Sequence, residues 1–302
     1  MIKVNFFIVG STKAGTTSLH NYLNSHPEIE MSSEKEPHYF CYKDIWKDFN
    51  GPGDIEICKK MVIDSKERYF SLFNENKKIT GESTASYLHI TGTAKKIWDY
   101  NKSAKILIIL RNPVDRAISA YNHLVRDGRE KENIELAFDK EQSRLNDNWM
   151  PFWGYKEQSF YYNNVLEYVS LFGKRNVKIL IYENCFKDID ATLNEITQFL
   201  EISDFNFPTN YKENISGVPK SQFLHKQIRS PNKYVKNIYK LIPTKTRKFI
   251  KSKINKLNMT SSENVSLEFK EKLKLQYYED VENLEIIAPG VMDAWGYCRE
   301  HK

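Results

Sequence analysis

Three short apolar runs, each followed by a segment with helical spacing, dominate the hydrophobic pattern of the chain. The first run, Val4–Val9, ends at Gly10 and is followed, after a loop, by a helical pattern over Thr16–Asn24. A mostly apolar run of this length is typical of a strand that is buried on both faces of a parallel sheet. The pattern therefore predicts a strand and then a helix at the N-terminus.

The same succession occurs twice more. The run Lys105–Leu110 leads through Pro113 into a helical stretch that ends near Val125, and the run Asn176–Tyr182 precedes helical spacing over Ile189–Leu200. Repeated strand–helix units are built into a parallel sheet with helices on both faces. We therefore expect an α/β fold with a central parallel sheet flanked by helices.

The rest of the chain predicts one domain over residues 1–302. An amphipathic helix is expected over Leu267–Tyr278, with apolar residues packing back after it at Leu284, Ile287 and Trp295. The aromatic stretch Asn148–Tyr162 suits either the core or the wall of a cleft. A basic helical excursion is expected at about 220–256.

Composition narrows the class of protein. Hydrophobic residues make up 40% of the chain and charged residues 28%, as in ordinary globular proteins. No stretch approaches the ~18 consecutive apolar residues of a membrane span, and the N-terminal run is too short for a signal peptide, so we expect a cytoplasmic protein. The cysteines are scattered along the chain, at Cys41, Cys58, Cys185 and Cys298. Because they lack metal-binding spacing, we expect neither a disulfide framework nor a metal site.

Positive charge is concentrated in one segment. Residues Lys220–Lys256 hold twelve Lys or Arg and no Asp or Glu, whereas the whole chain has a net charge of +6. The segment therefore suits peripheral contact with an anionic glycan or membrane surface, although a solvated basic face explains it equally well. We expect no nucleic-acid partner.

The first strand leads into the loop Gly10–Thr17, which reads GSTKAGTT. A strand, a glycine-containing loop and a helix start form an anion site, because backbone amides and the helix dipole favour negative charge. Lys13 adds a full positive charge, and the hydroxyls of Thr16 and Thr17 add hydrogen-bond donors. A Walker A motif needs Lys after the second glycine, so this loop disfavours a magnesium-dependent NTPase.

The second strand carries a matching signal at its carboxyl end, where ligands bind in open α/β sheets. Arg111 follows this strand directly, and Ser119 lies on the next helix. Arg116 and Ser119 are spaced to share a helix face. A guanidinium and a hydroxyl at such a place suit a phosphate monoester.

With these residues in view, the segments GSTKAGTTSLHNYL and ILRNPVDRAISAY resemble the 5′-phosphosulfate loop and the 3′-phosphate segment of sulfotransferases that use 3′-phosphoadenosine 5′-phosphosulfate (PAPS). The resemblance is greatest to the carbohydrate branch, meaning heparan sulfate N- and 3-O-sulfotransferases and bacterial glycan enzymes. It runs from about residue 4 to 215, and three further segments fit in order: Ser33–Phe40, Gly81–Tyr87 and Ser159–Tyr162.

The resemblance implies a P-loop-like sulfotransferase fold and a donor site. Arg111 and Ser119 would hold the 3′-phosphate, and Lys220, at the end of Asn214–Lys220, stands for a basic loop that closes over the nucleotide. Lys13 would also contact the bridging oxygen of the phosphosulfate. The cradle for the 5′ end would consist of consecutive loop residues: Lys13, Ala14, Gly15, Thr16 and Thr17.

The same resemblance implies the catalytic groups of an in-line sulfuryl transfer that needs no metal. Glu36 occupies the place of the general base, and His38 that of a histidine near the acceptor. Glu82 is a competing acid, and only the resemblance favours Glu36. Family members with 3-O specificity differ at Thr17, Cys41 and Ser83, so the acceptor stays open between a glycan and a small hydroxylated molecule.

Two other readings remain open at this point. One is a P-loop nucleotide kinase or NTPase, which the missing Gly-Lys-Ser/Thr triplet disfavours. The other is a non-catalytic protein that binds a glycan or a membrane surface through Lys220–Lys256.

Overall fold

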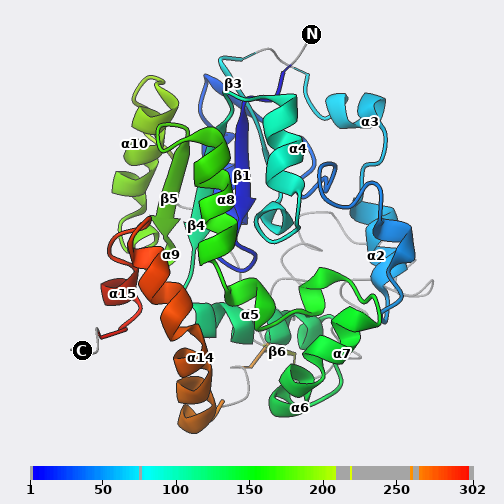
Figure 1. Ribbon diagram of the computed structural model, residues 1–302. Coiled ribbons are helices and arrows are strands. Elements are labelled where there is room, and N and C mark those ends of the chain that lie inside the picture. The colour runs from blue at the N-terminus through cyan, green and yellow to red at the C-terminus, as the bar shows by residue number, and fades with distance from the viewer. Residues whose placement is uncertain (1–2, 75–76, 209–217, 220–258, 261–264, 299–302) are drawn as a thin grey trace, which may run out of the picture.

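A parallel five-stranded sheet lies at the centre of the computed structural model, which describes residues 3–74, 77–208, 218–219, 259–260 and 265–298 (Figure 1). The strand order is β2-β3-β1-β4-β5, so β1 is the middle strand. Phe6 of β1 pairs with Gly81 on one side and with Lys105 on the other. The strands are β1 Phe6–Gly10, β2 Ile29–Met31, β3 Ile79–Ser83, β4 Lys105–Leu110 and β5 Val177–Ile181.

Each predicted strand is present, and two strands of the central sheet, β2 and β3, were missed. The run Lys105–Leu110 matches β4, and the other two runs match β1 and β5 to within two residues at each end. The strand β2 is too short to give a pattern. The strand β3 contains Thr80, Glu82 and Ser83, all buried, so its polar composition conceals it. The central parallel sheet of the predicted fold class is confirmed.

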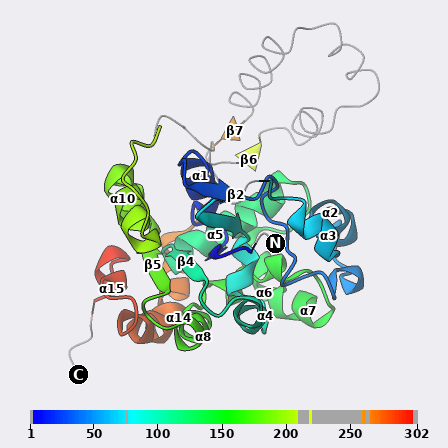
Figure 2. The same cartoon turned by 90° about the horizontal axis from the view of Figure 1, so that it is seen from above.

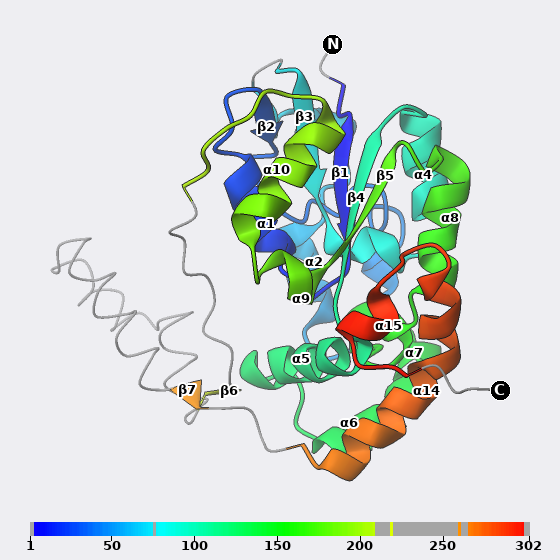
Figure 3. The same ribbon diagram turned by 90° about the vertical axis from the view of Figure 1, so that its left-hand side faces the viewer.

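Helices cover both faces of the sheet (Figure 2 and Figure 3). On one face α1 and α10 bury Leu19, Leu23 and Ile196 against Ile8 of β1. On the other face α4 and α8 pack against the opposite side of the same strands. These helices are α1 Thr16–Leu23, α4 Thr93–Tyr100, α8 Tyr162–Phe172 and α10 Ile189–Leu200.

A second group of helices lies beyond the carboxyl ends of the strands, at the bottom of Figure 1. One of these helices is α5, Pro113–Arg126, which follows β4. Asn112 caps it, because its side chain accepts hydrogen bonds from the amides of Val114 (3.0 Å) and Asp115 (3.3 Å). Wherever they lie in the fold, the other helices of the described residues are α2 Asp54–Met61, α3 Lys66–Phe70, α6 Ile134–Asp139, α7 Glu141–Asn146, α9 Tyr182–Cys185, α14 Leu267–Glu285 and α15 Val291–Ala294, with 3-10 turns η1 Trp46–Asp48, η2 Ala85–Leu88, η3 Pro151–Trp153 and η4 Glu157–Ser159.

The C-terminal helix is longer than predicted. It continues past Tyr278 to Glu285, and Leu284 and Trp295 are buried in the core as expected. A short antiparallel pair, β6 Val218–Pro219 with β7 Met259–Thr260, completes the described part. The predicted basic excursion and Lys220 lie outside the described residues. In the described part, no helix is both long and apolar enough to cross a membrane.

Candidate active site

The carboxyl ends of neighbouring strands bring the predicted site residues to one edge of the sheet. The loop Gly10–Thr17 follows β1, Arg111 follows β4, and Thr84–Tyr87 follow β3. In the sheet, β1 lies between β3 and β4. The chain therefore adds β2 and β3 on one side of β1, and β4 and β5 on the other. In open α/β sheets, ligands bind at the point where the strand order reverses in this way.

The loop after β1 is held in a conformation that only certain residues allow. Lys13 and Gly15 have φ angles of 69° and 83°. A Cβ atom at Gly15 would lie 2.5 Å from Cε2 of Phe186, so a side chain does not fit there. The helix α1 begins at Thr16, whose side chain is buried, whereas Thr17 is exposed. The amides of Thr16 and Thr17 begin α1 and lack intrahelical acceptors, so they suit an anion, whereas the next amide, that of Ser18, donates to the carbonyl of Gly15 over 3.1 Å.

Lys13 has an unusual charge environment. Burial, followed by the positive charges of Arg126 and Arg111, lowers the pKa of its ammonium from 10.5 to about 8. Asp127 opposes this shift. A lysine that is crowded by cations and partly desolvated gains stability when an anion binds beside it. The electrostatics of Lys13 therefore suit a polyanionic ligand.

Arg111 contacts this loop directly. Its Nη1 donates to the backbone carbonyl of Lys13 over 3.1 Å, and its guanidinium lies 4.9 Å from the centre of the Tyr182 ring. Its Nε is buried and has no partner among the described residues. Such an atom costs free energy unless a ligand accepts from it. Tyr182 was not predicted as a site residue.

Arg116 and Ser119, which their spacing places on one face of α5, differ in burial. Ser119 is half-buried on α5, whereas Arg116 is fully buried and donates to the protein interior. The helical spacing predicts which residues share a face, but it does not show which face is covered by other elements.

The loop after β2 places Glu36 at the same edge. Its amide donates to the carbonyl of Ser83 (3.0 Å), and its Oε2 accepts from the amide of Ala85 (3.0 Å). Its Oε1 forms an ion pair with Lys35, and 24% of its side chain is exposed. Burial acts to raise the pKa of Glu36, but Lys35 and His38 outweigh it, so the pKa lies below its ordinary value. Glu36 is therefore an ionised carboxylate that solvent can reach.

His38 lies beside Glu36 and is almost completely buried. Its Nε2 is 3.9 Å from Oε2 of Glu36, and its Nδ1 is 3.6 Å from Sγ of Cys41. Its ring stacks on Tyr42 at a centroid distance of 4.9 Å. Burial lowers the pKa of His38 to about 4, so the imidazole is neutral at physiological pH.

The carboxylate of Glu82, the competing acid, accepts hydrogen bonds at both of its oxygens. Its Oε1 accepts from the hydroxyls of Tyr69 (2.7 Å) and Tyr87 (3.0 Å), and its Oε2 accepts from Thr84 (2.8 Å). Burial raises the pKa of Glu82 to about 7. Tyr87 also accepts from the amide of Phe40, so Glu82 supports the loop that carries Glu36 and His38.

Several residues that contact the site were not predicted, namely Thr12, Lys35, Ala85 and Tyr182. The motif GESTASY contained a signal for one of them, because Ala85 lies within it and binds Glu36 through its backbone. Among the described residues, no cluster of His, Cys, Asp or Glu has the arrangement of a metal site.

Comparison with known proteins identifies the family of the chain. The sulfotransferase domain model matches residues 3–276. A crystal structure of a sulfotransferase from Alicyclobacillus acidocaldarius is 38% identical, with a TM-score of 0.67 over 71% of this chain and 87% of that one.

Curated relatives match over shorter stretches. The membrane-associated sulfotransferase kil1 of Dictyostelium discoideum is 37% identical over 122 residues, which is 40% of this chain and 23% of that protein. Heparan sulfate glucosamine 3-O-sulfotransferase 5 of Mus musculus is 32% identical over 126 residues, which is 42% of this chain and 32% of that protein. The chain thus spans less than half the length of these relatives. The resemblance seen in the sequence is confirmed, and the chain belongs to the sulfotransferase family.

Proposed function

We propose that this sulfotransferase moves a sulfuryl group from PAPS to a hydroxyl or amine of an acceptor, by in-line displacement with Glu36 as general base. The hydrogen bond from Arg111 to the Lys13 carbonyl carries the proposal, because it joins the two elements expected to hold the two ends of the donor. Glu36 lies at the same edge of the sheet, beyond β3.

The donor would lie with its phosphosulfate in the loop Gly10–Thr17 and its 3′-phosphate near Arg111 and Ser119. The N-terminal amides of α1 and the ammonium of Lys13 supply positive charge at the first place. The unpartnered Nε of Arg111 supplies a charged donor at the second. Lys13 would stabilise the charge that develops on the leaving phosphate oxygen.

The choice of Glu36 over Glu82 has support from their surroundings. Glu36 is 24% exposed and has a lowered pKa, so it is ionised and within reach of an acceptor. Glu82 is fully buried and accepts three hydroxyl hydrogen bonds. A positioned carboxylate that takes the acceptor proton contributes about 10²–10⁴-fold to the rate. His38 would orient either Glu36 or the acceptor.

The acceptor that we favour is a glycan, with a small hydroxylated molecule as the alternative. Relatives named carbohydrate sulfotransferase 15 and heparan sulfate glucosamine 3-O-sulfotransferase 5 support a glycan. Contact of residues 220–256 with an anionic glycan or membrane surface, closure of Lys220 over the nucleotide, and a cytoplasmic location belong to this proposal as well.

The deciding experiment combines binding and transfer. We expect PAP to raise the melting temperature of the protein, and ATP with magnesium to leave it unchanged. Labelled PAPS should then transfer its sulfuryl group to at least one member of a panel of glycans and small alcohols. Stabilisation by ATP with magnesium, and none by PAP, would instead support the NTPase reading.

A further inference from the structure

Arg116 is a cation enclosed by neutral groups. It is fully buried in α5, and its Nε donates to the hydroxyl of Ser159 over 2.6 Å. Its Nη1 donates to the hydroxyl of Thr12 over 3.1 Å, and its Nη2 donates to the carbonyl of Tyr155. Among the described residues, no carboxylate lies within ion-pair distance of it. Burial accordingly lowers the pKa of Arg116, and Tyr161, Tyr277 and Glu141 oppose this shift.

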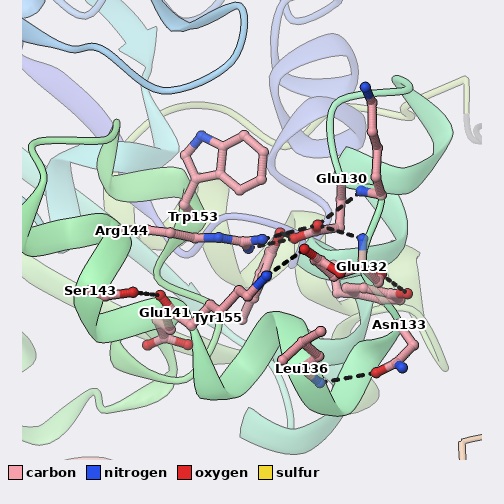
Figure 4. Close-up of polar contacts among 12 residues, drawn as sticks. Glu130, Glu132, Asn133, Leu136, Glu141, Ser143, Arg144, Trp153 and Tyr155 are labelled. Carbon is pink, nitrogen blue, oxygen red and sulfur yellow. Dashed lines mark hydrogen bonds and ion pairs between the residues drawn. The ribbon is translucent and has the colours of Figure 1, made fainter.

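A second buried arginine of the same fold, Arg144, is paired with a carboxylate, as buried arginines usually are. Arg144 donates to both carboxylate oxygens of Glu130, over 2.6 and 3.1 Å, and the hydroxyl of Tyr155 donates to the same carboxylate over 2.8 Å (Figure 4). Both side chains of the pair are at most 8% exposed. Tyr155 therefore serves the two arginines, with its hydroxyl bound to the partner of Arg144 and its carbonyl bound to Arg116.

The position of Arg116 connects its charge to the donor loop. Thr12, which accepts from Arg116 and donates to Oε1 of Gln158 over 3.2 Å, directly precedes Lys13. Arg116 is also among the cations that lower the pKa of Lys13. A buried charge without a counter-ion is costly, whereas the low dielectric around it strengthens its attraction for a nearby anion.

We propose that Arg116 is a positioning residue of the donor site, a buried cation that orders the phosphosulfate loop through Thr12 and whose charge is balanced by the anionic donor. This inference rests on the proposed function, because it assumes that the loop takes a polyanionic nucleotide. It assigns Arg116 no contact with the donor.

The test compares two arginine substitutions that remove the same charge. R116Q removes the uncompensated cation, whereas R144Q removes a paired one and serves as the matched control. Urea unfolding measures the stability of each variant, and calorimetry measures the affinity of the folded protein for PAP and for inorganic pyrophosphate. Pyrophosphate reports on the loop without requiring a nucleotide.

We expect R116Q to weaken both PAP and pyrophosphate binding by about tenfold or more, because one unit of positive charge behind the loop is lost. R144Q should lower stability and leave both affinities within about twofold of wild type, because its charge pair lies outside the loop. R116K, which keeps the charge and loses the planar fork, should recover part of the affinity. If R116Q does not fold, T12V tests the same link from the loop side and should also weaken both ligands.

The outcomes separate the two proposals. Wild-type affinities in R116Q or T12V would show that Arg116 only supports the fold, and would overturn the inference. If wild type binds pyrophosphate but does not prefer PAP over AMP, the proposed donor is wrong, and the pyrophosphate measurements still decide the role of Arg116. If wild type binds neither ligand, both proposals are overturned.

Discussion

Arg111 donates a hydrogen bond from Nη1 to the backbone carbonyl of Lys13 over 3.1 Å, and this contact joins the carboxyl ends of β1 and β4. Its remaining donors, including the buried Nε, are oriented by that bond and by the Tyr182 ring. The loop Gly10–Thr17 and Arg111, which are expected to bind the two phosphate ends of the donor, are therefore connected. A substitution in one of them should also weaken binding at the other.

Replacing Arg111 should remove the preference for a 3′-phosphate. Loss of a charged hydrogen-bond donor costs about 1.5–3 kcal/mol. Calorimetry should therefore show wild type binding PAP far more tightly than AMP, and R111A binding the two almost equally. S119A should reduce the preference by less, because a hydroxyl is a neutral donor. A preference for PAP that survives in R111A would contradict the assigned role.

Donor affinity should depend on the charge of Lys13. Its pKa of about 8 means that the free protein carries the protonated form below this pH and loses it above. PAP affinity should thus decrease as the pH rises through about 8. In K13M the affinity should be weak and almost constant from pH 7 to 9, and turnover should be lost as well. Parallel pH curves for wild type and K13M would exclude Lys13 as the titrating group.

The general base is tested by a substitution that keeps shape. E36Q retains hydrogen bonding but does not accept a proton at neutral pH, so turnover should decrease by about 10²-fold or more. PAP affinity, measured in parallel by calorimetry, should stay near the wild-type value, and H38A should have an intermediate effect on turnover. If E36Q turns over normally while E82Q or H38A is inactive, the base has been misassigned although the family has not.

Glu82 should make stability dependent on pH. Because burial raises its pKa from 4.5 to about 7, the folded protein holds a proton that the unfolded chain has released. Its contribution to stability is therefore present below about pH 4.5 and is lost as the pH rises through about 7, by up to about 3 kcal/mol. E82Q should show a flatter melting temperature over this range than wild type. Identical pH profiles would mean that the carboxyl titrates in its ordinary range.

Local sequence signals were sufficient for much of the fold. The apolar run Lys105–Leu110 and the helix Ile189–Leu200 have the predicted bounds, because the strand pattern and helical spacing are carried by consecutive residues. The loop Gly10–Thr17 was identified for the same reason, since a glycine-containing turn between a strand and a helix is a local feature. Resemblance then named the family, which the comparisons confirm.

Burial of polar groups was decided only by the tertiary structure. The sequence alone did not separate Glu36 from Glu82, because the complete burial of Glu82 and its hydrogen bond from Tyr69 of α3 arise only in the folded chain. Nor did helical spacing show that Arg116 is enclosed by Thr12, Tyr155 and Ser159. The cost of burying a charge depends on partners that are distant in the chain, and such partners meet only when the sheet and its helices have assembled.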